Sequence, residues 1–198
     1  MRFIIGVFLC LSLSAFSSTN DVNVNNNSSV NNSESVQAYM IDFSSQEEGR
    51  WRVTNDGVMG GLSNGKMIFK KDHGVFMGDI SLDNNGGFSS VFRAVGGLPE
   101  SFDELIIDSE GDGQAYQLRL VVYINGYRLA YKHDFQTVAN KREKLKFQLS
   151  DFKATFRGRI MTNAPSLRSE DIKEVGFLMT KKVAGKFSLS IFELFFIQ

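Results

Sequence analysis

Cysteine, proline, tryptophan and histidine are scarce in this chain, and its charge is balanced. Cys10 is the only cysteine among 198 residues, and it lies in an apolar N-terminal run. If that run is removed, the rest of the chain has no disulfide, no thiol nucleophile and no thiolate metal site. The 22 basic and 22 acidic residues give a formal net charge of zero, which disfavours binding to nucleic acid.

The short motifs of several enzyme classes are also missing. His73 and His133, the only histidines, are not spaced as metal ligands on a helix. No G-x-S-x-G segment occurs. Residues 57–61 (GVMGG) lack the strand-to-helix context of a dinucleotide fingerprint and the Lys-Ser/Thr of a Walker loop. These absences predict a protein that is not an enzyme and holds no cofactor.

Composition divides the chain into three segments. Residues 1–17 have the features of a secretory signal peptide, with Arg2 before a short apolar run and a cleavage site at residues 15–17 (AFS). The run is about 14 residues long, short of the ~20 that span a bilayer as a helix. Residues 18–36 are almost all Asn and Ser and predict a disordered linker. Residues 37–198 are one domain, which we expect to be secreted or periplasmic, in any case extracytoplasmic.

Alternating apolar and polar side chains predict that this domain is built of strands. Residues 72–73 (DH) and 125–126 (NG) are signals for hairpin turns. Residues 166–173 (SLRSEDIK) are the only segment of the domain that looks briefly helical. The predicted strands are residues 36–43, 65–71, 74–82, 88–95, 103–109, 115–124, 127–135, 144–150, 174–180 and 186–197.

The fold class that this pattern predicts is all-β, a jelly-roll β-sandwich. Many short strands separated by turn signals are typical of sandwiches and barrels, and long crossing loops favour a jelly roll over a plain meander. These loops lie near residues 44–64, 96–102 and 151–168. The 18 phenylalanines suit buried strand faces and indicate a substantial core.

Two glycine-dense segments flank a predicted strand, residues 55–61 (NDGVMGG) and residues 84–90 (NNGGFSS). Glycine is needed where φ is positive or where another backbone passes close, and Asn-Gly pairs build tight turns. A structural role therefore explains both segments, and a binding surface is the alternative. Trp51, just before the first segment, fits a core position, and stacking on a sugar ring is its alternative role.

Carboxylates leave two further interpretations open. Asp108, Glu110 and Asp112 alternate at a predicted turn and are candidate oxygen ligands for calcium, although the other ligands of an EF-hand loop are absent. A glycosidase would need two carboxylates facing each other across a cleft, and Asp56 and Asp79 join Asp108 and Asp112 as candidates.

The motifs, taken in their order, closely resemble the complex I intermediate-associated protein 30 family. Its pattern is a Trp followed by N-D-G-V-M-G-G-x-S, then F-x-G-x-I-S-L, then N-N-G-G-F-S-S-V with an arginine. The matching parts here are Trp51, residues 55–63, residues 76–82, residues 84–91 and Arg93. Arg93 comes one residue later than the family places it, after an additional Phe92. The resemblance covers roughly residues 40–198.

The resemblance implies a galactose-binding-domain-like jelly roll with no catalytic residues. Mitochondrial members of the family act as assembly factors, which bind intermediates of respiratory complex I without being part of the finished enzyme. They work on the matrix side of the membrane, whereas a secretory signal would place this chain on the opposite side.

Two binding functions follow, and hydrolysis is a third function with less support. The first is a non-catalytic protein that binds a protein partner, such as an assembly intermediate of a membrane complex. The alternative is an extracytoplasmic carbohydrate-binding module. The candidate binding surface consists of Trp51, Asn55, Asp56, Met59, Ser63, Asn84, Asn85 and Arg93.

Overall fold

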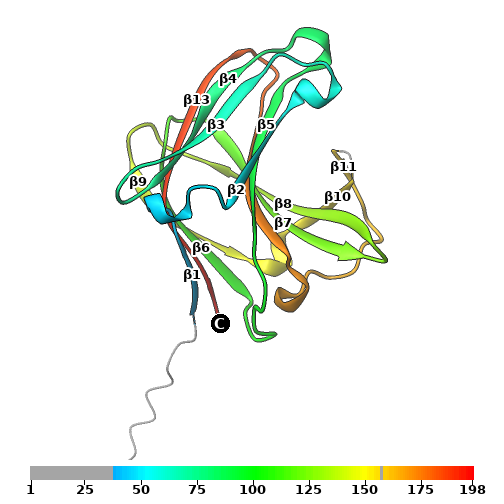
Figure 1. Cartoon of the computed structure of the whole chain (residues 1–198). Helices are drawn as coiled ribbons and strands as arrows, with labels where there is room; N and C mark the ends of the chain where they lie inside the picture. The colour runs from blue at the N-terminus through cyan, green and yellow to red at the C-terminus, as the bar shows by residue number, and fades with distance from the viewer. Residues whose placement is uncertain (1–37, 157) are drawn as a thin grey trace, which may run out of the picture. The chain divides into compact units, whose positions relative to one another are not determined.

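The computed structural model describes residues 38–156 and 158–198, which form two antiparallel β-sheets. The predicted signal peptide and linker lie outside the described residues. Within these residues, thirteen strands and five short 3-10 helices make up the regular structure, and the two sheets enclose a core between them (Figure 1). The predicted all-β sandwich is therefore confirmed. Among the described residues, no helix is long and apolar enough to cross a membrane.

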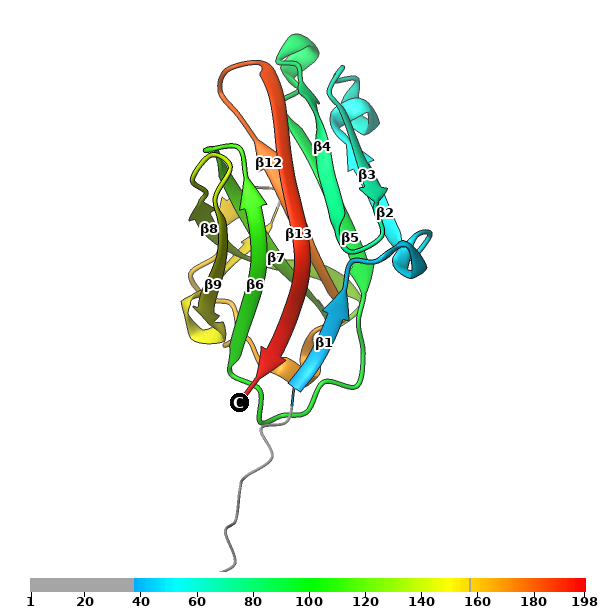
Figure 2. The ribbon, with the colours of Figure 1, turned by 90° about the vertical axis from the view of Figure 1, so that its left-hand side faces the viewer.

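The first sheet, sheet A, has six strands, and β13 lies at its centre. Its main order is β3-β4-β13-β6-β9, and β1 also pairs with β13 (Figure 2). The strands are β1 (Ala38–Asp42), β3 (Asn64–Phe69), β4 (Gly74–Ile80), β6 (Glu104–Gly111), β9 (Arg142–Gln148) and β13 (Gly185–Ile197).

The second sheet, sheet B, has seven strands in the order β11-β10-β8-β7-β12-β5-β2. These strands are β2 (Trp51–Asn55), β5 (Phe88–Ala94), β7 (Ala115–Ile124), β8 (Tyr127–Gln136), β10 (Lys153–Phe156), β11 (Arg159–Ile160) and β12 (Glu174–Thr180). The 3-10 helices are η1 (Ser45–Glu47), η2 (Asp56–Met59), η3 (Asp83–Asn85), η4 (Leu149–Asp151) and η5 (Ser169–Asp171).

Strand β13 has two successive neighbours along one of its edges. Residues 185–191 pair with β4 and residues 193–197 pair with β1, while β6 lies along the other edge. The register with β6 shifts between Ile191 and Glu193, which leaves one additional residue on β13. Leu189, Ile191 and Leu194 are completely buried, as expected of a central strand.

The local signals predicted most of these strands well. The turn between β7 and β8 contains Asn125 and Gly126 with φ of 51° and 81°, as the Asn-Gly pair predicted. The backbone N–H of Lys70 donates to the carbonyl of His73 over 2.8 Å, which closes the other predicted hairpin. His133 on β8 is half-buried, and its ring centre lies 4.9 Å from that of Phe147.

Three segments differ from the prediction. The expected loop over residues 44–64 contains β2, and the expected loop over residues 151–168 contains β10 and β11. Residues 51–55 (WRVTN) do alternate apolar and polar side chains, but the segment is short and offers only two apolar positions, Trp51 and Val53. The helical segment expected over residues 166–173 is reduced to the single 3-10 turn η5.

Candidate functional site

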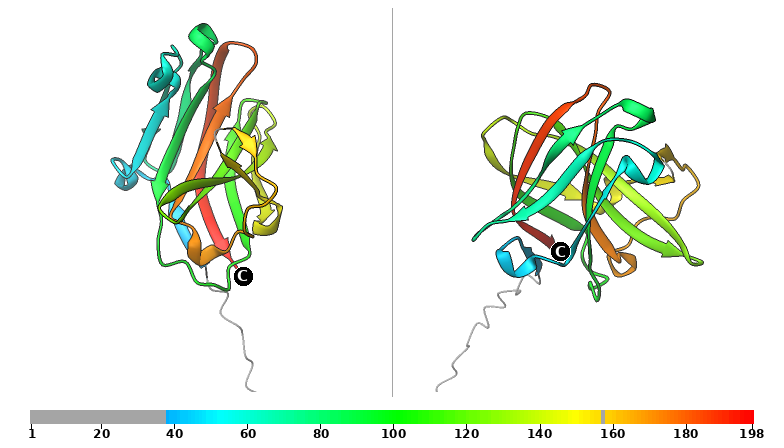
Figure 3. Two further views of the ribbon diagram at one scale, coloured as in Figure 1. Left: turned by 90° about the vertical axis from the view of Figure 1, so that its right-hand side faces the viewer. Right: turned by 45° about the horizontal axis from the view of Figure 1, so that its top comes forward.

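Three connections meet at one end of the sandwich: β2 to β3 through η2, β4 to β5 through η3, and β12 to β13 (Figure 3). We call this end the loop tip, and it consists of residues 56–62, 82–87 and 181–184. The side-chain N–H of Asn84 donates to the carbonyl of Gly60 over 3.0 Å, and the backbone N–H of Lys181 donates to the carbonyl of Gly87 over 3.2 Å. Both glycine-dense segments therefore belong to one surface.

Asp56 holds the loop tip together from inside. Its side chain is completely buried and accepts hydrogen bonds from the backbone N–H groups of Ser63 (2.9 Å), Gly87 (2.6 Å) and Phe88 (3.2 Å). The Ser63 hydroxyl adds a fourth bond of 2.5 Å. Burial opposes ionisation, but these hydrogen bonds outweigh it and hold the pKa of Asp56 below its ordinary value. The carboxylate is thus a structural anion that joins two loops.

The glycines beside Asp56 make room for its carboxylate. A Cβ atom at Gly61 would lie 2.3 Å from Cγ of Asp56, and one at Gly86 would lie 2.6 Å from its Oδ2. Gly60 has φ of +88°, a conformation that residues with a side chain rarely adopt. Glycines of both segments therefore leave the space that the buried Asp56 carboxylate occupies.

Asn55 performs a similar task between the two sheets. Its Nδ2 donates to the carbonyl of Gly65 on β3, and its Oδ1 accepts from the N–H of Gly65, both over 3.1 Å. The Ser89 hydroxyl on β5 also donates to Oδ1 over 2.7 Å. A Cβ atom at Gly65 would lie 1.9 Å from the Ser89 hydroxyl oxygen, so only glycine fits this approach.

Large apolar side chains project into solvent from the loop tip. Val58, Met59 and Leu62 on the first loop are exposed by 73%, 68% and 62%, and Val183 on the third loop by 74%. Leu82 on the second loop is exposed by 39%. All three loops thus present apolar surface on a frame fixed by internal hydrogen bonds.

The residues that the sequence suggested for binding divide between this surface and the interior. Met59, Asn84 and Asn85 are exposed on the loop tip. Asp56 and Ser63 are buried, and Asn55, described above, uses its amide within the protein. All three polar side chains thus form hydrogen bonds within the protein.

Trp51 lies in the core and has no ring face available to a ligand. Its ring packs 4.9 Å from that of Phe43 and 6.3 Å from that of Phe177, measured between centroids. Its indole Nε1 is buried without a hydrogen-bond partner among the described residues. The interpretation of Trp51 as a core residue is therefore correct, and its proposed stacking on a sugar is not compatible with this position.

Arg93 lies on β5, away from the loop tip, and binds Glu47 of η1. Its Nε and a terminal nitrogen contact the two carboxylate oxygens of Glu47 at 2.6 and 3.3 Å. Burial would lower the pKa of Arg93, but bonds to Glu47 and Tyr39 outweigh burial and raise it. Arg93 thus fastens η1 to sheet B, and the structure corrects its assignment to the binding surface.

The acidic residues predicted to form a turn lie on β6 (Asp108, Glu110) and just after it (Asp112), and they do not gather as metal ligands. Asp108 binds Arg142 through two bonds of 2.8 and 3.0 Å. Asp112 instead accepts from the Tyr116 hydroxyl at 3.0 Å and from the backbone N–H of Ser188 at 2.8 Å. Among the described residues, no three carboxylate, histidine or cysteine side chains come together as a metal site.

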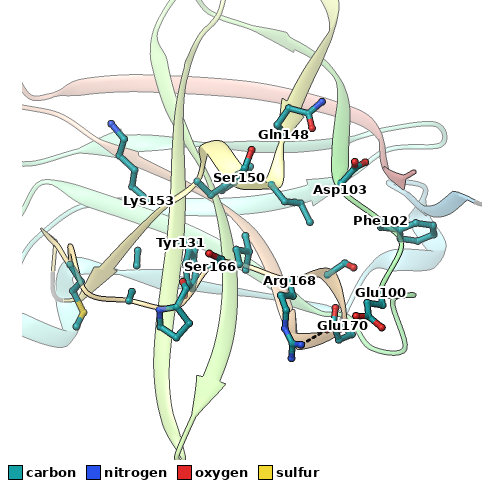
Figure 4. A pocket seen from close by; sticks show the side chains of 18 of the residues that line it. Glu100, Phe102, Asp103, Tyr131, Gln148, Ser150, Lys153, Ser166, Arg168 and Glu170 are labelled. Atoms are coloured by element: carbon teal, nitrogen blue, oxygen red, sulfur yellow. Dashed lines mark hydrogen bonds and ion pairs between the residues drawn. The ribbon is translucent and has the colours of Figure 1, made fainter.

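A cavity of about 740 Å³ lies away from the loop tip, under the connection that runs from η4 to η5 (Figure 4). The Tyr131 hydroxyl donates to the carbonyl of Pro165 over 2.7 Å, which holds this connection against β8. Arg168 binds Glu170 at 3.1 Å at the cavity wall (Figure 4). The sequence did not predict this cavity, because its walls come from a long connection and from loop residues near Phe102.

Two facing antiparallel sheets with loop-borne polar networks define a jelly-roll sandwich of the galactose-binding-like class. A family 11 carbohydrate-binding module from Clostridium thermocellum, solved with a β-1,3-1,4-mixed-linked tetrasaccharide, superposes with a TM-score of 0.61 at 13% identity, covering 81% of this chain and 95% of that one. The family 11 module of a cellulosomal cellulase from the same organism gives 0.60 at 16% identity, covering 82% and 95%. These likenesses show the fold.

The family follows from the sequence itself. The model of the family described as complex I intermediate-associated protein 30 matches residues 41–191. The chain therefore belongs to the complex I intermediate-associated protein 30 family, as its motifs predicted. No curated protein matches the chain.

Proposed function

We propose that this chain is a non-catalytic binding protein whose loop tip docks onto a protein partner. The observation that carries the proposal is the set of exposed apolar side chains on three adjoining loops, Val58, Met59, Leu62, Leu82 and Val183. Exposed apolar surface of this kind marks interaction sites, since solvent contact is unfavourable for it.

The rigidity of the loop tip supports the same proposal. Asp56 and the Asn84 amide fix the loops before any partner arrives. A surface that is already ordered loses little conformational freedom on binding, so more of the contact energy contributes to affinity. Two of the carboxylates suggested for a glycosidase are instead engaged separately, Asp56 by loop N–H groups and Asp108 by Arg142.

The family name supports a partner that belongs to an assembling complex. The matched family is described by its association with an intermediate of complex I. We propose an assembly intermediate of a membrane complex as the partner of this chain. The signal-like residues 1–17 support an extracytoplasmic location, so the partner would present its binding surface on that side of the membrane.

Carbohydrate binding is the second candidate function. Its support is that the similar solved structures are carbohydrate-binding modules. Against it stands the position of Trp51, which is 8% exposed and packs in the core. Sugar rings commonly rest on open aromatic faces, and the loop tip offers aliphatic side chains and the amides of Asn84 and Asn85 instead.

The test is affinity capture with the full chain from envelope and membrane extracts. Met59→Ser and Val183→Ser remove apolar surface without touching the Asp56 network, and Tyr127→Ser is the matched control. Tyr127 is 75% exposed and follows the β7–β8 turn. This turn lies at the end of the sandwich opposite the loop tip. We expect the tip variants to lower capture of a stoichiometric protein about tenfold and the control to leave it unchanged.

Two results would contradict the proposal. The first is capture of the same protein with equal yield by the tip variants, all of them folded by circular dichroism. The second is co-purification of glycan alone, together with polysaccharide binding that survives high salt, which would favour the carbohydrate-binding function.

A further inference from the structure

A row of cationic side chains crosses the outer face of sheet B. Lys153 on β10 is directly opposite Lys132 on β8, and Lys132 is directly opposite Arg119 on β7. The row continues to Gly176 on β12 and Phe92 on β5. Residues that alternate with these along β7, β8 and β12 belong to the core, so the row lies on the face turned away from it.

The three cations are poorly compensated. Neighbouring strands lie about 4.8 Å apart, and like charges directly opposite each other destabilise a sheet. Lys132 has a partner in Asp134, with 2.8 Å between Nζ and Oδ2. Neither Arg119 nor Lys153 forms an ion pair with any described residue. The chain thus places three adjacent cations beside one carboxylate, although its overall charge is zero.

Arg119 is the most constrained of the three. Its Nε and one terminal nitrogen donate to Oε1 of Gln117 at 3.1 and 2.7 Å, and the other terminal nitrogen donates to the Thr155 hydroxyl at 2.9 Å. Both partners are neutral. Burial lowers the pKa of Arg119, which the charge of Asp134 opposes, yet a guanidinium stays protonated at neutral pH. A partly buried cation without a direct ion-pair partner is costly.

The position beside Arg119 carries no side chain. A Cβ atom at Gly176 would lie 2.2 Å from the carbonyl oxygen of Val91 and 2.5 Å from the Phe92 ring. No side chain therefore stands between Arg119 and Phe92 in this row. Arg128 covers the Phe92 ring, with its guanidinium carbon 4.6 Å from the ring centre.

On the far side of the face, two arginines share one carboxylate. Glu174 accepts a bond of 2.8 Å from Arg128 and forms an ion pair of 3.5 Å with Arg52. The Tyr123 hydroxyl donates to the same carboxylate over 2.9 Å. Each arginine here contacts a carboxylate, whereas the cations without an ion-pair partner, Arg119 and Lys153, lie on β7 and β10.

We propose that this cationic row binds an acidic segment of a polypeptide, whose Asp or Glu carboxylates supply the missing counter-charges. We choose an acidic ligand on the basis of charge complementarity. Arg119 and Lys153 have no ion-pair partner among the described residues, and guanidinium groups pair well with carboxylates. The row has no open aromatic face for a sugar ring, since Arg128 covers Phe92. This surface is separate from the loop tip, so the inference goes beyond the proposed function.

The probe is a peptide of alternating Glu and Ser, and the same peptide with Gln in place of Glu is its control. Binding to the full chain is measured by titration calorimetry at several salt concentrations. We expect the acidic peptide to bind, the neutral one not to bind, and added salt to weaken the complex. Lys153→Gln should weaken binding about fivefold and Arg119→Gln at least about tenfold, with Arg119→Lys between wild type and Arg119→Gln.

Matched variants separate recognition from folding. Lys182 is exposed on the loop tip, and Lys182→Gln should leave peptide affinity unchanged. Lys153→Gln should leave the melting temperature unchanged or raise it, since it removes a repulsion. A lowered melting temperature would instead assign Lys153 a structural role and overturn the proposal.

Other outcomes would also overturn it. These are no saturable binding of the acidic peptide, equal affinity in the Lys153 and Arg119 variants, or tighter binding of an acidic oligosaccharide such as oligogalacturonate than of the peptide. Met59→Ser must leave peptide binding intact, so a failure of the loop tip proposal is distinguished from a failure of this one.

Discussion

Replacing the buried carboxylate of Asp56 by an amide tests the whole account of the loop tip. In Asp56→Asn one oxygen becomes an NH2 group, which then faces at least one backbone N–H donor, from Ser63 or from Gly87 and Phe88. A buried donor without an acceptor costs about 1–3 kcal/mol, and hydrogen bonds to a charged group contribute about 1.5–3 kcal/mol. We therefore expect the variant to lose about 2–4 kcal/mol of unfolding free energy at pH 7.

The pH dependence gives a second, independent signature. The pKa of Asp56 in the folded protein lies below its ordinary value of 3.8, so ionised Asp56 stabilises the fold above that pH. This stability is lost as the pH falls from 3.8 through the lower folded pKa, where the wild-type side chain takes up a proton. The difference between wild type and Asp56→Asn should accordingly be largest near neutral pH and shrink under acid conditions.

Urea denaturation followed by tryptophan fluorescence is a suitable assay, because Trp51 is the only tryptophan and lies in the core. Asp83→Asn is the matched control on the same end of the molecule. Asp83 is exposed and accepts from the Ser81 hydroxyl at 3.0 Å, so its replacement should change stability by less than about 0.5 kcal/mol. Equal stability of Asp56→Asn and wild type, or a difference independent of pH, would refute the reasoning.

Two further substitutions test other contacts by the same assay. Gly86→Ala places a Cβ atom 2.6 Å from the buried carboxylate and should lower the unfolding free energy by about 1–3 kcal/mol. Gly57→Ala, with no atom within 4 Å of its Cβ, should change stability little. Equal effects of the two substitutions would contradict the close packing of Gly86 on Asp56. Arg93→Ala leaves Glu47 without its bidentate partner and should cost about 3 kcal/mol, well above Arg50→Ala, whose exposed side chain contacts the same carboxylate. The reverse order would show that Arg93 is not the main partner.

Strands formed by local alternation could be predicted closely from the sequence. The boundaries of β7 and β12 match the prediction to the residue, because each carries a regular pattern and ends at a turn signal. Strand β2 was not predicted because its alternating pattern is only five residues long, and its pairing with β5 completes it as a strand. The same holds for β11, which has only two residues and pairs with β10.

The candidate binding residues do not all lie on one surface of the structure. The sequence pointed to both glycine-dense segments, and they do meet at the loop tip. It could not show that Asp56 points inward, because an aspartate after an asparagine in a turn is ordinarily exposed. Only the approach of Gly87 and Phe88 from a distant loop turns that side chain into an internal anchor.

The sequence by itself determined the fold class and the family, because strand alternation, turn residues and motif order are local properties of a chain. The tertiary structure alone decided which polar groups remain free. Asn55 and Asp56 form hydrogen bonds with Gly65 and Gly87, which lie 10 and 31 positions away in the sequence. Arg119, Lys132 and Lys153 lie side by side although they come from three strands. Such pairings depend on sheet register, which is set by long-range packing.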